Sequence, residues 1–88
     1  MPTATVSTVT LRVLLFGSYA EILGFDSVEV TLDSLATVGD VLERLKALPG
    51  GEKLPPRPLC ALNLSQVSVN AALSPSDELA VLPPLAGG

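Results

Sequence analysis

The feature that most constrains the fold is one long helical pattern in a chain that otherwise shows only short strand patterns. Its apolar residues recur at helical spacing, and they are Val38, Val41, Leu42, Leu45 and Leu48. Thr37, followed three residues later by Asp40, resembles a capping box at the start of this helix, and residues 49–51 (Pro-Gly-Gly) stop it. Because a helix with one apolar stripe must bury that stripe against another layer, we predict a main helix packed on a sheet.

Two strand patterns precede this helix. In residues 9–16, one face carries Val9, Leu11, Val13 and Leu15, and the other carries Thr10, Arg12, Leu14 and Phe16. Since the apolar Leu14 and Phe16 stand on the second face, we expect a central strand whose outer face is partly covered. Residues 27–32 alternate cleanly and predict a half-buried strand. Between the two strands, Ser18 is expected to cap a short helix over residues 19–23 that ends at Gly24.

Three shorter strand patterns follow the helix, at residues 59–62, 66–69 and 78–82. The connection over residues 49–58 holds four of the eight prolines, so we predict a surface loop there. Residues 74–77, Ser-Pro-Ser-Asp, fit a type I turn that leads into the last strand.

The order of these elements indicates the fold class. Two strands, the main helix and three more strands predict an α+β fold with a mixed sheet of about five strands and one helix on one face. This is the outline of a ubiquitin-like β-grasp. We assign residues 1–8 to a loose leader, residues 9–82 to the domain and residues 83–88 to an extended tail.

The composition excludes most kinds of catalytic site. Histidine is absent and Cys60 is the one cysteine, so no Ser-His or Cys-His pair, disulfide framework or four-thiolate cluster can form. We predict no metal site. Cys60 lies in an apolar run, which favours a buried small hydrophobe over a reactive thiol. A partner must therefore perform most of any chemistry.

The charge and hydropathy of the chain limit its partners. The net charge is −4, from nine acidic and five basic residues. Nucleic-acid phosphates normally bind clustered Lys and Arg, so we expect no nucleic-acid partner. The apolar run at residues 13–16 is too short for a signal peptide, and no segment approaches the length of a membrane span. We expect a cytoplasmic protein that does not bind a membrane.

The C-terminal sequence from Asp77 to Gly88, DELAVLPPLAGG, resembles the close of the MoaD family, the small subunit of molybdopterin synthase. That family typically ends on Asp-Glu, a short apolar strand, Pro-Pro, two variable residues and Gly-Gly. The other matching residues, which resemble the family's first strand, short helix and main-helix start, are 13–16, Ala20, Glu21, Gly24 and 37–40. One departure is Ser76, where the family usually has Gly, so the turn there could be of another type.

The resemblance implies that Gly88 is the reactive residue of a sulfur carrier. An E1-like enzyme would use ATP to form an acyl-adenylate at Gly88, and a sulfur donor would convert it to a thiocarboxylate. The thiocarboxylate would enter the large subunit of molybdopterin synthase and donate sulfur to cyclic pyranopterin monophosphate. The chain itself would bind no cofactor, and the large subunit would hold the catalytic side chains of this sulfurtransferase. The resemblance also implies a heterotetramer, in which two small subunits flank a dimer of large subunits.

The tail and one face of the sheet are predicted to bind these partners. The two final glycines suit a narrow channel because they lack Cβ atoms. The two prolines hold the exit extended, and Leu85 is a candidate apolar anchor. On the outer face of the sheet, Leu14, Phe16 and Leu82 would form a docking patch, unless the chain's own loops cover them. The predicted partner-binding residues are Leu14, Phe16, Leu82, Pro83, Pro84, Leu85, Ala86 and Gly87.

Two other functions fit the same sequence. The first is a sulfur carrier of another pathway, such as thiazole formation in thiamine synthesis or tRNA thiolation. Such carriers share the β-grasp and Gly-Gly but ordinarily lack Pro-Pro before it. The second is a non-catalytic β-grasp interaction module with a frayed tail, whose activity would survive deletion of Gly88.

Overall fold

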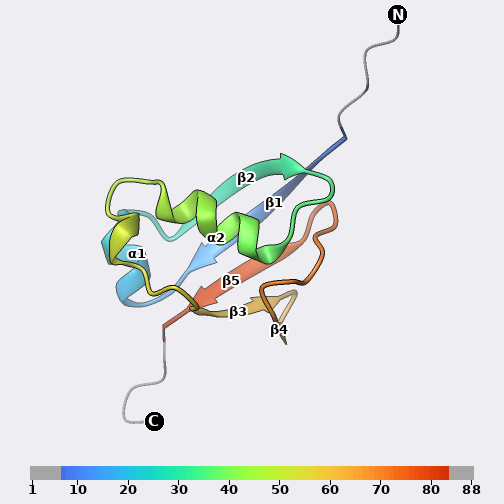
Figure 1. Cartoon of the computed structure of the whole chain (residues 1–88). Coiled ribbons are helices and arrows are strands. Elements are labelled where there is room, and N and C mark those ends of the chain that lie inside the picture. Colours follow the sequence, from blue (N-terminus) through green and yellow to red (C-terminus); the bar gives the residue numbers. More distant parts are fainter. Residues whose placement is uncertain (1–6, 84–88) are drawn as a thin grey trace, which may run out of the picture.

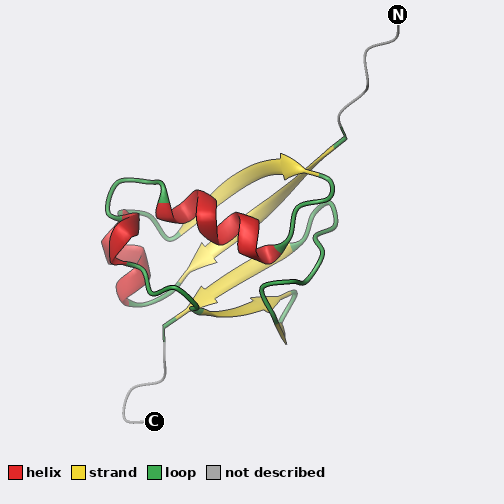
Figure 2. Cartoon of the chain, in the orientation of Figure 1, coloured by secondary structure: helices red, strands yellow, loops and turns green. Residues whose placement is uncertain are grey.

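A computed structural model describes residues 7–83 of the chain. The described residues form one mixed sheet with the order β2-β1-β5-β3-β4, and helix α2 crosses one face of it (Figure 1; Figure 2). The elements are β1 (Thr8–Leu15), α1 (Ser18–Leu23), β2 (Ser27–Asp33), α2 (Val38–Lys46), the 3₁₀ helix η1 (Gly51–Lys53), β3 (Leu59–Leu62), β4 (Ser65–Val67) and β5 (Glu78–Leu82). The predicted α+β architecture, with one main helix on one face, is confirmed.

The strand pairing places the first and last strands side by side at the centre of the sheet. β1 runs antiparallel to β2 and parallel to β5, and β3 runs antiparallel to both β5 and β4. Because β1 and β5 are parallel, their C-terminal ends meet at the same end of the sheet (Figure 1). The start of α1 and the exit of the C-terminal tail are therefore neighbours.

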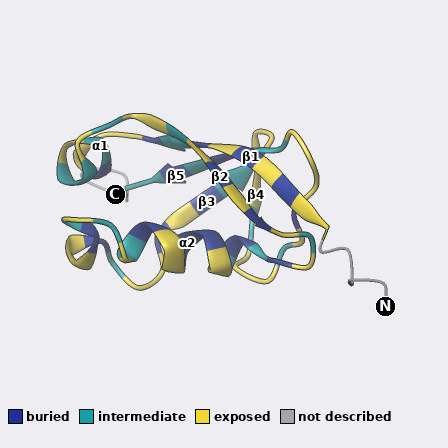
Figure 3. Cartoon of the chain, turned by 90° about the horizontal axis from the view of Figure 1, so that it is seen from above, coloured by how far each residue is buried: buried dark blue, intermediate teal, exposed yellow. Residues whose placement is uncertain are grey.

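The core lies between α2 and the face of the sheet that α2 covers (Figure 3). The buried side chains of α2 are the predicted stripe without its last member, namely Val38, Val41, Leu42 and Leu45. Alternate residues of β1 and β5 face them and are buried too, namely Val9, Leu11, Val13, Leu15, Leu79 and Val81. Each such side chain stabilises the fold by about 1.5–3 kcal/mol through removal of its surface from water.

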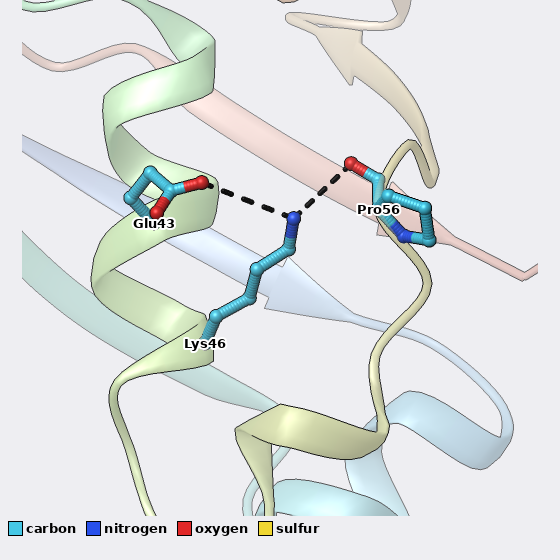
Figure 4. Close-up of polar contacts among 3 residues, drawn as sticks. All are labelled: Glu43, Lys46 and Pro56. Atoms are coloured by element: carbon cyan, nitrogen blue, oxygen red, sulfur yellow. Dashed lines mark hydrogen bonds and ion pairs between the residues drawn. The ribbon is translucent and has the colours of Figure 1, made fainter.

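Helix α2 begins as predicted and ends earlier. The backbone N–H of Thr37 donates to Oδ2 of Asp40 over 2.8 Å, which gives the capping box its reciprocal bond. The helix ends at Lys46, before Leu48, which is only half-buried. Lys46 Nζ donates to the carbonyl of Pro56 over 3.1 Å and lies 3.9 Å from Oε2 of Glu43 (Figure 4). This contact holds the proline-rich connection against the end of the helix.

The sequence predicted that the connection after α2 is a loop throughout, and this is not what the structure shows. The connection contains η1, closed by a bond from the N–H of Lys53 to the carbonyl of Gly50 over 3.0 Å. Gly50 takes a φ of 87°, a left-handed value that favours glycine and turns the chain into η1. Pro49 precedes η1 and the other three prolines follow it, so none lies inside this short helix.

Other boundaries also differ from the prediction. β1 begins one residue early, at Thr8, and ends before Phe16. The strand predicted at residues 66–69 is β4, which starts and ends earlier because the turn before it is only two residues long. Both turn residues, Asn63 and Leu64, have positive φ values of 49° and 75°, as a type I′ hairpin turn requires.

Two turn predictions were wrong. Ser18 does not cap α1, because Gly17 occupies the N-cap position and no side chain caps the helix there. The turn at residues 74–77 is closed by a bond of 3.2 Å from the N–H of Asp77 to the carbonyl of Ser74, but Ser76 has a φ of 68°. A positive φ at the third residue defines a type II turn rather than type I.

Candidate functional site: the open face and the tail exit

The face of the sheet opposite α2 carries an apolar patch. Strand register places Leu14 of β1 beside Ala80 of β5, Ala80 beside Ala61 of β3, and Leu82 beside Leu59. Phe16 continues the alternation of β1 past its end. We call this set the open-face patch, and its members are Leu14, Phe16, Leu59, Ala61, Ala80 and Leu82.

The exposure of the open-face patch fits a surface that another protein could cover. Phe16 and Leu59 are 44% and 38% exposed, and the other members are half-buried. The structure thus brings together Leu14, Phe16 and Leu82, which the sequence had singled out. It adds Ala80, which the alternation of β5 already placed on the face of Leu82, and Leu59 and Ala61, whose face follows from the pairing of β3 with β5.

A charged row borders the open-face patch. Arg12 of β1 lies opposite Glu29 of β2 and opposite Glu78 of β5 in the register of the sheet. Since two carboxylates flank one guanidinium, the border of the patch is net negative.

The C-terminal tail leaves the sheet at the edge of this patch. The N–H of Phe16 donates to the carbonyl of Val81 over 3.3 Å, beyond the end of β1. Pro83 has no N–H to continue the ladder, and its ring lies against Gly17. A Cβ atom placed at Gly17 would lie 3.1 Å from Cγ of Pro83. The predicted reactive residue Gly88 and the predicted partner-binding residues Pro84, Leu85, Ala86 and Gly87 lie outside the described residues.

The one thiol is buried and unreactive. Cys60 is 3% exposed, and its Sγ–H donates to the carbonyl of Pro58 over 3.6 Å. Burial raises the pKa of the Cys60 thiol, so it stays protonated at neutral pH and is a poor nucleophile. The prediction of a buried small hydrophobe is confirmed.

Tyr19 of α1 is the other titratable side chain in the core. Its hydroxyl is buried and has no hydrogen-bond partner within residues 7–83. Burial, and to a smaller extent the nearby Cys60, raise the pKa of the Tyr19 hydroxyl, so the phenol stays neutral. Neither group is poised for catalysis.

Two features are absent from the described part of the chain. No cluster of three or more His, Cys, Asp or Glu side chains in it could hold a metal ion. None of its helices is both long enough and apolar enough to cross a membrane.

Several known proteins are similar to this chain in sequence and in fold. A model of the ThiS family matches residues 13–88. SAMP1 from Haloferax volcanii is 32% identical, with a TM-score of 0.78 and coverage of 90% of this chain and 99% of that chain. A putative molybdopterin converting factor subunit 1 from Pyrococcus furiosus is 26% identical, with a TM-score of 0.76 and coverage of 88% and 99%.

A third solved structure shares the fold at lower sequence identity. It is a chain of the complex of subunits 1 and 2 of the molybdopterin-converting factor from Helicobacter pylori. That chain is 20% identical, with a TM-score of 0.69 and coverage of 91% of this chain and 100% of that chain. Together, these similarities confirm the predicted ubiquitin-like β-grasp.

Proposed function

Because this chain belongs to the ThiS family of ubiquitin-like sulfur carriers, we propose that it carries sulfur as a thiocarboxylate on Gly88 for molybdopterin synthesis. The supporting observation is the tail exit: β5 ends at Leu82, directly before Pro83 and beside an exposed apolar patch, and the sequence continues as the Pro-x-x-Gly-Gly of molybdopterin synthase small subunits. The similarity to a putative molybdopterin converting factor subunit 1 supports the same pathway.

The chemistry begins with activation of the terminal carboxylate. A C-terminal carboxyl group has a pKa of about 3.3–3.7, so at neutral pH it is an anion and a poor electrophile. An E1-like enzyme would join a Gly88 oxygen to the α-phosphorus of ATP, with pyrophosphate as the leaving group. A sulfide-level donor would then attack the acyl carbon and displace AMP, which leaves a thiocarboxylate. We propose that the protein acts in the cytoplasm, where ATP is available for this activation.

The second half of the reaction takes place in a partner. The large subunit of molybdopterin synthase would receive the tail and supply the acids and bases that this chain lacks. The thiocarboxylate sulfur would form a bond to a side-chain carbon of cyclic pyranopterin monophosphate, while a carbon–oxygen bond at that carbon breaks and its oxygen leaves with a proton from the large subunit. Hydrolysis of the resulting thioester would leave sulfur on the pterin and return the Gly88 carboxylate. Two such transfers would give the dithiolene of molybdopterin.

The open-face patch is the proposed docking surface for both partners. Its apolar members would be buried, while Glu29 and Glu78 at its border would favour a partner with basic residues there. The complex of subunits 1 and 2 from Helicobacter pylori supports a large-subunit partner for a protein of this fold. We propose two copies of this chain in a heterotetramer with two large subunits.

The proposal is tested by intact mass. The chain is incubated with ATP, an E1-like enzyme that is active on a known carrier, and a sulfur donor. We expect one terminal oxygen to be replaced by sulfur, and a variant without Gly88 to stay unchanged. The thiocarboxylated chain is then given a large subunit and cyclic pyranopterin monophosphate. An unchanged mass in the first step would reject the carrier function, and absence of a dithiolene product would reject only the pathway.

The similarity to SAMP1, the small archaeal modifier protein 1 of Haloferax volcanii, supports a second candidate, a protein modifier. The same Gly88 acyl-adenylate would then react with a lysine amine of a target protein, release AMP and leave an amide bond. The activation assay separates the two functions when the sulfur donor is replaced by a lysine-bearing acceptor protein. A covalent adduct that resists thiols and hydroxylamine would favour the modifier.

A further inference from the structure

Gly17 lies where β1 turns into α1, directly beside the residue at which the tail leaves the sheet. The turn is closed by a bond of 3.2 Å from the N–H of Tyr19 to the carbonyl of Phe16. Gly17 has φ 56° and ψ −133°, which are the values of the second residue in a type II′ turn. Glycine is the residue that adopts this backbone conformation without steric cost.

The missing side chain of Gly17 is also what makes room for Pro83. An added Cβ would lie 3.1 Å from Cγ and 3.9 Å from Cδ of the Pro83 ring. Unstrained carbon atoms sit about 3.5–4.0 Å apart, so the ring would have to move by several tenths of an ångström. Pro83 is the last described residue, and a shift of its ring changes the direction in which the tail continues.

The contact also follows the last hydrogen bond between the two strands. The N–H of Phe16 donates to the carbonyl of Val81, and no further bond between the β1 and β5 segments follows it within the described residues. On the other side of β5, Leu82 still pairs with Leu59 of β3. On the β1 side, packing of the Pro83 ring on Gly17 is therefore the contact that follows the ladder and helps to orient the exit.

We infer that Gly17 is a positioning residue: it is the seat on which the Pro83 ring rests, and this contact fixes the point and the backbone direction from which the C-terminal tail leads to a partner docked on the open-face patch. This role rests on the proposed carrier function. Binding of the partner by the open-face patch and orientation of the tail by Gly17 are separate functions. A partner would still bind a chain with a disturbed seat, but the acyl carbon would be misplaced in the partner's channel.

The chain contains a matched control for a substitution at Gly17. Gly24 at the other end of α1 also has a positive φ, 86°, but a Cβ placed there meets no atom within 4 Å. Gly24→Ala therefore reports a positive φ without a collision, whereas Gly17→Ala adds the collision with Pro83 and a ψ of −133° that alanine disfavours, and only the collision is relieved when Pro83 is also replaced. Pro83→Ala removes the Cγ and Cδ atoms involved in that collision.

The experiment measures the rate of thiocarboxylate formation against carrier concentration for the wild type, Gly17→Ala, Gly24→Ala, Pro83→Ala and the Gly17→Ala/Pro83→Ala double variant. Circular dichroism and thermal melting establish the folded fraction of each. We expect Gly17→Ala to lower kcat by roughly ten- to a hundredfold, as misplacements of about 1 Å do, with KM nearly unchanged. Gly24→Ala should keep the wild-type kcat, and the double variant should recover to the level of Pro83→Ala.

The possible outcomes separate this inference from the function on which it rests. If the wild type is charged and Gly17→Ala matches it, or if the double variant is slower than Pro83→Ala, the seat is rejected and the carrier function stands. If the wild type itself is not charged by a competent enzyme, the carrier function fails and the role of the seat with it. Should Gly17→Ala not fold, Pro83→Ala alone must lower kcat without a change in thermal stability, or the inference is overturned.

Discussion

Leu64 at the tip of the β3–β4 hairpin holds a conformation that its side chain does not favour. It has a φ of 75°, and its side chain is 95% exposed, so almost no burial offsets the strain. An L-residue in this left-handed region costs roughly 1–2 kcal/mol, and glycine avoids that cost. Glycine in turn loses about 0.5–1 kcal/mol through the greater freedom of the unfolded chain. Leu64→Gly should therefore stabilise the domain by about 0.5–1 kcal/mol, and raise Tm by a few degrees.

Leu35 provides the control for this prediction. Its side chain is 88% exposed and its φ is not positive, so Leu35→Gly carries the same loss of side chain and the same gain in unfolded-chain freedom without any relief of strain. Free energies of unfolding from urea titrations of both variants should differ by roughly 1–2 kcal/mol in favour of Leu64→Gly. Equal values for the two variants, or a Leu64→Gly variant less stable than the wild type, would refute the strain at Leu64.

Three further results are expected. Ser76→Gly should raise Tm by a few degrees because Ser76 has a φ of 68° in an exposed turn, whereas Ser74→Gly in the same turn should lower it; thermal melting decides. Leu59→Ser should raise the KM for this chain in the activation assay about tenfold with kcat unchanged, since a buried interface anchor contributes about 1.4 kcal/mol or more, and Leu35→Ser should leave KM alone. Because the pKa of the Cys60 thiol is raised in the folded state, the thiol of the unfolded chain loses its proton at a lower pH than the thiol of the folded chain. The free energy of unfolding should therefore be constant below the ordinary thiol pKa of 9.0 and fall above it. Urea midpoints across that range test this, and a midpoint that rises with pH would contradict it.

The repeating elements of this fold were predictable because their signals are local. The helical spacing from Val38 to Leu45 and the alternation of β1 each report which side of one element is buried, and both were right. The Thr37–Asp40 box also lies within four residues, so its geometry could be inferred from spacing alone.

What the sequence did not reveal depends on contacts between distant segments. Leu59 and Ala61 belong to the open-face patch only because β3 pairs with β5 in a particular register. The left-handed conformations of Leu64 and Ser76 were missed because neither residue type signals a positive φ, and the surrounding turns impose it. The contact between Gly17 and Pro83 was also missed, because the two residues lie far apart in the chain.

Because β5 lies at the centre of the sheet, the sheet can be completed only after the C-terminal part of the chain has been synthesised. β1 and β3 both pair with β5, so a nascent chain that lacks residues 78–82 leaves both strands without their shared neighbour. Such long-range pairing makes folding slower than the formation of helices and hairpins, and the sheet closes only when nearly the whole chain has left the ribosome. The residues that complete the sheet directly precede the Gly-Gly end, so a chain that stops before residue 78 lacks both the central strand and that end.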